Sequence, residues 1–203
     1  MLISILTFQG FNELDSLIAL GVLNRIKKPA WKVNICCPED SVTSMNGVTV
    51  LAQSRLEDIP NSDAVVIGSG MLTRDIAKNE AIMGMIKLDP SRQLIAAQCS
   101  GTLLLAKLGL LGKIPACTDL TTKPWVQEAG VEILNQAFYA DGNIATAGGC
   151  LAATYLAAWI IARTEGLEAA KSALHYVAPV GEKEIFVDRA MKNIEPYLFS
   201  RGG

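Results

Sequence analysis

The sequence predicts an α/β protein with a mostly parallel central sheet that helices cover on both faces. Apolar runs of strand length alternate along the chain with longer runs whose apolar residues recur at helical spacing. The runs 63–67 and 93–98 are largely apolar, which is typical of strands buried on both faces of a parallel sheet. With 203 residues, we expect a single domain, 1–203, with a substantial core.

The first half of the chain carries clear start and turn signals. Asn12 is a favourable helix N-cap residue, and apolar side chains follow it at helical spacing. Asn46-Gly47 is typical of a hairpin turn. The predicted elements are a strand at 2–8, a helix at 12–27, a strand at 31–37, a hairpin at 41–54, a strand at 63–67 and a helix at 73–88.

The second half continues the alternation. Gly112 ends one predicted helix, and Asp141-Gly142 is a predicted turn between strands. The uncharged stretch between Asp141 and Arg163 contains several Gly and Thr residues, so it predicts a strand, a turn and a buried helix rather than a membrane span. The predicted elements are strands at 93–98, 114–118, 131–134, 138–139 and 144–146, and helices at 100–111, 122–129, 150–163, 168–176 and 184–199, the last broken near Pro196.

Composition excludes several classes of function. The net charge is −2, from 18 basic and 20 acidic residues, and no basic block stands out, so we expect no nucleic-acid and no membrane partner. The five cysteines include no C-x-x-C pair and the chain has one histidine, so we expect no metal. Reduced thiols and an apolar start without a basic region predict a cytoplasmic protein without a signal peptide.

Cys99 is the most informative residue. It lies between the predicted strand 93–98 and Ser100-Gly101, which opens a predicted helix. A strand, one reactive residue, a small residue, a glycine and a helix form the pattern of a nucleophile elbow. The helix N-terminus beside the thiol predicts a lowered pKa for Cys99.

Other residues are candidates for the same site. Gly68, Ser69 and Gly70 follow strand 63–67, and their backbone N–H groups could pair with that of Ser100 to bind an anion, or simply form a tight turn. Asp15 lies among apolar residues of the first predicted helix, where a partly buried carboxyl could act as general acid or base, or else cap the helix in solvent.

Three further positions are weaker candidates. Asp119 and Cys150 follow predicted strands and could line the same cleft, with core packing as the alternative. His175 is the one histidine, and it matters because histidine commonly activates a catalytic thiol. A structural role for it is the alternative.

These motifs resemble the ThiJ/PfpI superfamily, which shares the class I glutamine-amidotransferase-like fold. The resemblance covers nearly the whole chain. It implies a flavodoxin-like three-layer sandwich, a homodimer, and an acidic residue of the first helix, here Asp15, against the elbow cysteine, here Cys99. It rests on Phe8, Leu14-Asp15, Val65–Gly70, Ala97–Gly101, Leu105–Gly112 and Thr146–Gly149.

Departures from the family patterns select among subgroups. PfpI-type proteases carry histidine directly after the cysteine, where this chain has Ser100. Deglycase-type and glyoxalase-type members use glutamate and a later histidine, where this chain has Asp15 and Asp119. The frame is most similar to isocyanide hydratases, although Cys-Thr-Gly and Thr-Thr-His are here Cys99-Ser100-Gly101 and Cys117-Thr118-Asp119, and Pro-Gly-Gly is here Ile67-Gly68-Ser69.

The resemblance therefore implies a cysteine-dependent hydratase or hydrolase of a small electrophilic molecule. Cys99 would form a covalent thioimidate or thioester, Asp15 would act as general acid and base, and no cofactor would be needed. The alternatives are a redox-responsive or regulatory protein in which Cys99 is oxidised, a glyoxalase-like or deglycase-like enzyme, and a silent scaffold.

Overall fold

The computed structural model describes residues 1–198 and contains one large sheet. Its strand order is β5-β2-β1-β6-β7-β9-β8, and every neighbouring pair is parallel except β8 and β9. This confirms the predicted α/β class with a mostly parallel sheet. The strands are β1 (Leu2–Leu6), β2 (Lys32–Cys37), β5 (Ser54–Arg55), β6 (Ala64–Ile67), β7 (Leu94–Gln98), β8 (Phe138–Asp141) and β9 (Ile144–Ala147).

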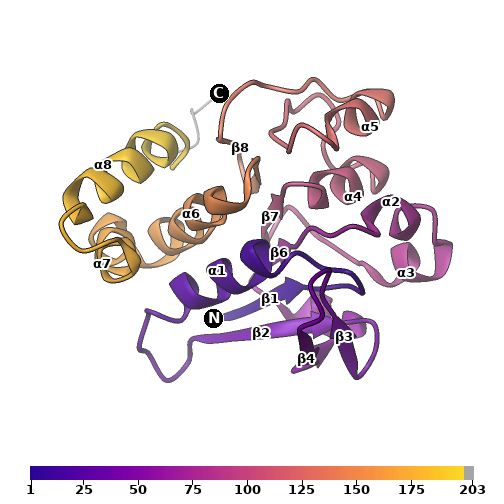
Figure 1. The fold of residues 1–203 in the computed structure, drawn as a ribbon, viewed down its shortest axis with the longest axis horizontal. Coiled ribbons are helices and arrows are strands. Elements are labelled where there is room, and N and C mark those ends of the chain that lie inside the picture. The colour runs from indigo at the N-terminus through magenta and orange to yellow at the C-terminus, as the bar shows by residue number, and fades with distance from the viewer. Residues whose placement is uncertain (199–203) are drawn as a thin grey trace.

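Helices cover both faces of this sheet (Figure 1). One face packs against α1 (Glu13–Leu23), α6 (Ala153–Glu165), α7 (Leu167–Val177) and α8 (Lys183–Ile194). The other face packs against α2 (Thr73–Ile76), α3 (Glu80–Met85), α4 (Gly101–Lys107) and α5 (Lys123–Glu128). The predicted hairpin also forms, as β3 (Ser41–Thr43) and β4 (Thr49–Leu51). It contacts the start of α1 through a hydrogen bond from the Met45 N–H to the Phe11 carbonyl, 2.9 Å long.

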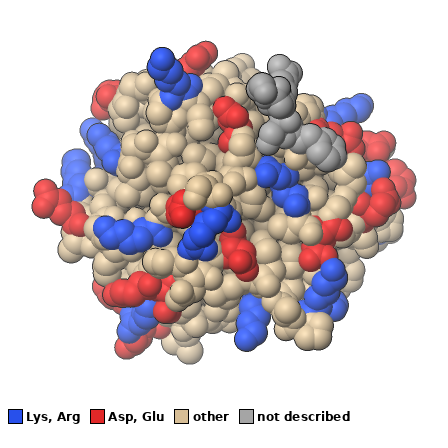
Figure 2. Space-filling model, turned by 180° about the vertical axis from the view of Figure 1, so that it is seen from behind, with Lys and Arg blue, Asp and Glu red and all other residues tan. Residues whose placement is uncertain are grey.

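The surface carries charges of both signs. On the face seen in Figure 2, Lys and Arg side chains are interspersed with Asp and Glu. No helix within residues 1–198 combines the length and the apolar character that a membrane crossing requires.

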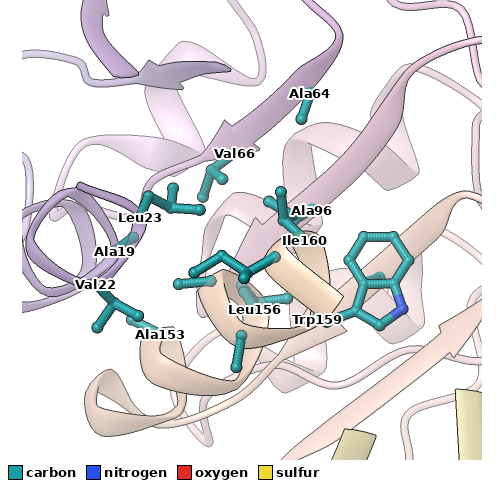
Figure 3. Packing of buried hydrophobic residues seen from close by; sticks show 14 of the residues in the cluster. Ala19, Val22, Leu23, Ala64, Val66, Ala96, Ala153, Leu156, Trp159 and Ile160 are labelled. Atoms are coloured by element: carbon teal, nitrogen blue, oxygen red, sulfur yellow. The ribbon is translucent and has the colours of Figure 1, made fainter. Parts of the chain in front are cut away.

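The core on the α1 and α6 side fixes the position of α1. Figure 3 shows Val22 and Leu23 of α1 lying beside Leu156 of α6 and Val66 of β6. Trp159 of α6 is 0% exposed, and burial of each such large side chain stabilises the fold by about 1.5–3 kcal/mol. Because α1 packs against both α6 and the sheet in this cluster, its first turn is held in a defined position beside the ends of the strands.

The structure corrects the predicted helix at 73–88. Two short helices, α2 and α3, replace it, with a break around Asn79. The Asn79 side chain accepts a hydrogen bond from the Ile82 N–H, 3.1 Å long, and so caps α3. A local side-chain cap therefore outweighs the helical apolar pattern here.

Other boundaries also differ. The predicted strands 114–118 and 131–134 are only an isolated parallel bridge between Ala116 and Ile133. The predicted helix 150–163 begins with a 3-10 turn, η2 (Cys150–Ala152). The chain breaks before Pro196, as predicted, into η3 (Glu195–Tyr197). A further 3-10 helix, η1 (Leu56–Asn61), was not predicted, and residue 199 of the last predicted helix lies outside the described residues.

Candidate active site

Four adjacent strands end at the candidate site. Strands β1, β6, β7 and β9 are neighbours in the sheet and run parallel. Asp15 follows β1 on α1, Ser69 follows β6, Cys99 follows β7 and Cys150 follows β9. Carboxyl ends of parallel strands are where open α/β sheets bind ligands, so the topology explains why residues distant in sequence meet here.

Cys99 has the backbone of a nucleophile elbow. Its φ of 47° makes it the one positive-φ residue other than glycine in the described part of the chain. Such a conformation costs on the order of 1–3 kcal/mol in a non-glycine residue. The Cys99 N–H donates to the Ala147 carbonyl at 2.8 Å, which ties the turn to β9.

Gly101 allows α4 to start directly behind this turn. A Cβ at this position would lie 2.6 Å from the Ile67 carbonyl oxygen and 2.8 Å from that of Gly68. Only glycine fits so close to β6, and the sharp turn depends on this approach.

Asp15 is a buried carboxyl with incomplete hydrogen bonding. It is 0% exposed, and Ser69 Oγ donates a hydrogen bond to its Oδ2. Its Oδ1 is buried and has no hydrogen-bond partner among the described residues. Burial raises the pKa of Asp15, partly offset by Ser69 and the two nearby thiols. The group is therefore suited to hold and release a proton.

Asp15, Cys99 and Cys150 form one compact cluster. A carboxylate oxygen and the two Sγ atoms all lie within 4.8 Å of one another. Cys99 is 4% exposed, whereas Cys150 is half-buried. Asn12 Nδ2 donates to Cys150 Sγ at 3.3 Å.

The structure corrects the expectation of a lowered thiol pKa. Burial, followed by the negative charge of Asp15, raises the pKa of Cys99 well above that of a free thiol. Burial and Asp15 also raise the pKa of Cys150. Since the negative charges of an Asp15 carboxylate and a Cys99 thiolate oppose each other, the two groups titrate as a coupled pair in which the thiol form of Cys99 is favoured.

The backbone amides near Cys99 divide into occupied and free groups. The Gly68 N–H donates to the Leu6 carbonyl at 3.0 Å, and the Gly70 N–H donates to Ser100 Oγ at 3.1 Å. Within residues 1–198, nothing accepts from the N–H groups of Ser69 and Ser100. The predicted anion-binding role is therefore reduced from Gly68, Ser69, Gly70 and Ser100 to Ser69 and Ser100.

Gly68 and the side chain of Ser100 have structural roles. A Cβ on Gly68 would lie 2.7 Å from Ser16 Oγ, so glycine is required there for packing rather than for ligand contact. Ser100 Oγ also pairs with Thr73 Oγ1 at 2.8 Å, which joins the elbow to the start of α2.

Cys99 lies in a cleft of ≈ 450 Å³. Half of the twelve lining residues are predicted site residues, and most of the others come from the β3–β4 hairpin and from the segment before and within α5. The lining residues are Asn12, Met45, Ser69, Gly70, Met71, Cys99, Ser100, Asp119, Thr121, Thr122, Trp125 and Cys150. The volume is that of a small-molecule site.

Asp119 lies on this lining, but its carboxylate has a local partner. Oδ1 accepts from the N–H groups of Thr121 and Thr122, both at 2.9 Å, and so caps the turn that leads into α5. Its negative charge contributes to the raised pKa of Asp15. Asp119 therefore contributes to the cleft lining while its carboxylate is held by the turn, and its predicted role in the site stays a prediction.

His175 does not belong to the cleft. It lies on α7, 50% exposed, with Nε2 3.5 Å from the Glu184 carboxylate. The cleft lining contains no histidine within the described residues, so the candidate proton carrier beside Cys99 is Asp15.

Sequence reasoning missed Gln98 and Trp125. Gln98 Nε2 donates to Cys99 Sγ at 3.4 Å and to the Gly149 carbonyl at 2.8 Å. A polar residue ending an apolar strand was the available signal for Gln98. Nothing local in the sequence indicates that Trp125 lines the cleft.

The same cluster is the place where a soft metal ion would find ligands. Asp15, Cys99 and Cys150 offer one oxygen and two sulfur atoms, but the raised pKa values of both thiols disfavour the thiolate forms that bind metals. The expectation of no metal stays a prediction.

The chain belongs to the DJ-1/PfpI family, which its sequence matches over residues 1–163. This confirms the superfamily expected from the motifs. The match identifies the family and makes no assignment to a subgroup, so the isocyanide hydratase resemblance remains a finer prediction. No curated protein matches the sequence significantly.

Solved structures support the same fold. DJ-1 from Schizosaccharomyces pombe superposes with a TM-score of 0.75 at 15% identity, covering 88% of this chain and 100% of that one. DJ-1beta from Drosophila melanogaster gives 0.75 at 21%, covering 87% and 96%. A ThiJ/PfpI family protein from Pseudomonas syringae gives 0.74 at 17%, covering 96% and 87%. At these identities the likeness is one of fold.

Proposed function

We propose that this protein is a cysteine-dependent hydratase or hydrolase of a small electrophilic molecule, with an isocyanide as the best candidate substrate. One observation carries the proposal: the Cys99 thiol lies in a ≈ 450 Å³ cleft, within 4.8 Å of a buried carboxyl that has a free acceptor atom. The arrangement supplies a nucleophile, a proton carrier and room for a substrate together.

The first step is addition of the thiol to the terminal carbon of the isocyanide. A bond forms between Cys99 Sγ and that carbon, while Asp15 receives the thiol proton and delivers it to the same carbon. The product is a thioimidate, covalently bound to Cys99. The un-ionised Cys99 thiol suits this step, because Asp15 takes its proton as the bond forms and the thiol does not need to be ionised beforehand.

The second step is hydrolysis of the thioimidate. Water adds to the carbon, Asp15 accepts one of its protons and delivers it to the imine nitrogen, and the N–H groups of Ser69 and Ser100 are the available donors to charge that develops on the substrate. The carbon–sulfur bond then breaks as the carbon–oxygen double bond forms, and Asp15 passes the hydroxyl proton to the departing sulfur, which restores the thiol. The sum is isocyanide plus water giving an N-substituted formamide.

The cleft favours an enzyme over a silent scaffold, because it has the volume of a small-molecule site beside the nucleophile. A glyoxalase-like or deglycase-like activity also starts from Cys99 and stays the second candidate. The absence of histidine from the described lining of the cleft makes it the weaker one. The small-molecule substrate and the predicted homodimer are likewise part of this proposal.

The test incubates the full chain with a small aliphatic isocyanide and measures the formamide by NMR, with intact-mass analysis for the covalent intermediate. We expect formamide, and an adduct that is lost in Cys99→Ala. The matched control is Cys117→Ala, which removes a fully buried thiol that does not line the cleft and retains activity. A native chain that forms neither formamide nor adduct with isocyanides would overturn the hydratase proposal, and reaction with dicarbonyl compounds alone would favour the second candidate.

A further inference from the structure

The second thiol of the cluster, Cys150, has no part in the proposed reaction. It is the first residue of η2 and lies across from Cys99 because β7 and β9 are paired in parallel, with Gln98 opposite Ala147 at the end of the register. The two segments that follow β7 and β9 therefore leave the sheet side by side. The amide of Gln98 links them by its contacts to Cys99 Sγ and the Gly149 carbonyl.

The geometry points to a reversible disulfide between Cys99 and Cys150, formed by hydroperoxides, that switches the nucleophile off. The two Sγ atoms lie within 4.8 Å of each other, whereas a disulfide needs about 2.0 Å. A small movement of one side must close this gap.

Cys150 is the less enclosed of the two thiols, because it is half-buried whereas Cys99 is 4% exposed. Gly149, with φ of 92°, precedes it, and a Cβ there would meet nothing within 4 Å, so the position is open. Gly148, by contrast, is fixed, because a Cβ there would lie 2.2 Å from the Thr118 carbonyl oxygen. We therefore assign the movement that closes the gap to the Cys150 side chain rather than to the backbone, because the Gly149 carbonyl accepts from Gln98 Nε2 and from the Ala152 N–H, both at 2.8 Å.

Access and local chemistry single out this pair. Cys99 and Cys150 both line the cleft, so a small oxidant that enters it reaches both thiols. The remaining thiols, Cys36, Cys37 and Cys117, are 0% exposed and do not line it. The unpartnered Oδ1 of Asp15 is an acceptor for the proton that each thiol must lose.

The chemistry balances in two steps. Cys99 Sγ attacks the terminal, hydroxyl-bearing oxygen of the peroxide, the O–O bond breaks, and Asp15 passes the thiol proton to the departing alkoxide, which gives a sulfenic acid on Cys99 and an alcohol, or water from hydrogen peroxide. Cys150 Sγ then attacks Cys99 Sγ, Asp15 passes the Cys150 proton to the departing hydroxide, and water leaves. The two thiols lose two electrons, which reduce the peroxide. A dithiol reductant reverses the change.

This reaction has a protective consequence. Without a second thiol, a sulfenic acid on Cys99 can proceed to the sulfinic acid, which thiols do not reduce. Capture by Cys150 stops oxidation at a stage from which the nucleophile can be recovered. The inference does not require the proposed hydratase activity, only the thiol of Cys99.

The test treats the full native chain with hydrogen peroxide, blocks remaining thiols with an alkylating agent, and maps the digest by mass spectrometry. We expect a peptide pair joined through Cys99 and Cys150 within one chain, complete loss of Cys99 alkylation, and full return of alkylation after a dithiol reductant. Cys117→Ser should give the same result. Cys150→Ser should give Cys99 sulfinic acid, with no return of alkylation.

Two outcomes would overturn the inference. One is sulfinic acid on Cys99 of the native chain while Cys150 remains free to alkylate. The other is a disulfide that links Cys150 between two chains, seen as a dimer on a non-reducing gel. Because the cross-link is measured by mass, its absence is distinguishable from failure of the hydratase proposal, which formamide production measures. A circular dichroism spectrum confirms that each variant folds.

Discussion

The Asp15 carboxyl and the Cys99 thiol approach each other within 4.8 Å, although one follows strand β1 and the other follows strand β7. Both are buried, and the charge of Asp15 raises the pKa of Cys99. In the proposed reaction the pair therefore acts as one proton-exchanging unit, rather than as a preformed thiolate beside a spectator acid.

Replacement of Asp15 by Asn removes the proton carrier but preserves the size of the side chain. We expect kcat for formamide production to fall by about 10²–10⁴-fold, the usual contribution of a general acid or base, with little change in KM. Asp188→Asn, an equal change of charge on an exposed position of α8, should leave both constants unchanged. Equal kcat values for Asp15→Asn and the native chain would remove Asp15 from the mechanism.

The raised pKa of Asp15 also predicts how stability depends on pH. The folded chain holds this proton more tightly than the unfolded chain, whose carboxyl titrates near 3.8. The resulting stabilisation is fully present below that value and is lost as pH rises through the raised folded pKa. Urea unfolding of the native chain and of Asp15→Asn across this range should therefore show native stability falling relative to the variant as pH increases. A constant difference between the two would contradict the raised pKa.

Trp125 is expected to bind the apolar part of the substrate. It lines the cleft, and the Arg74 guanidinium lies 4.9 Å from the centroid of its ring. Trp125→Ala should raise KM by roughly 10-fold with little change in kcat, because it removes uniform binding. Tyr176→Ala is the matched control, since Tyr176 lies on α7 outside this cleft and carries a similar contact from Arg25 at 4.4 Å. An equal effect of both variants would argue against a substrate contact at Trp125.

Gly101 is predicted to be essential for the elbow. In Gly101→Ala the new Cβ would lie 2.6 Å from the Ile67 carbonyl oxygen, and relief of this overlap should cost about 1–3 kcal/mol of unfolding free energy. Gly84→Ala is a suitable comparison, because Gly84 lies in α3 and a Cβ there meets nothing within 4 Å. That change should stabilise the protein or leave it unchanged. Chemical denaturation measures both, and a neutral Gly101→Ala would contradict the close approach.

The sequence was sufficient for the fold class because its strongest signals are local. The apolar strands, the glycine turns and the uncharged run of α6 each predict their element from neighbouring residues. The split of the predicted 73–88 helix depends on one side-chain cap at Asn79. The weak 114–118 strand pairs only through Ala116. Neither outcome follows from apolar periodicity.

The candidate site was predictable only in part. The elbow at Cys99 is a local pattern, and its positive φ agrees with it. The raised pKa of Cys99 comes from burial and from Asp15, which are tertiary effects that no spacing in the sequence displays. The Gly70 N–H is unavailable to a ligand because it donates to Ser100 Oγ, and this contact likewise depends on how two loops meet.

The most direct measurement is the pH dependence of Cys99 alkylation by iodoacetamide, read by peptide mass spectrometry in the native chain and in Asp15→Asn. Cys99 should label through the cleft while fully buried Cys117 does not, with an apparent pKa above the free-thiol value of about 8.5. That pKa should fall in Asp15→Asn, because the variant removes the carboxylate charge. Labelling no faster than that of Cys117, or a pKa that is the same in both chains, would contradict the coupled Asp15–Cys99 pair.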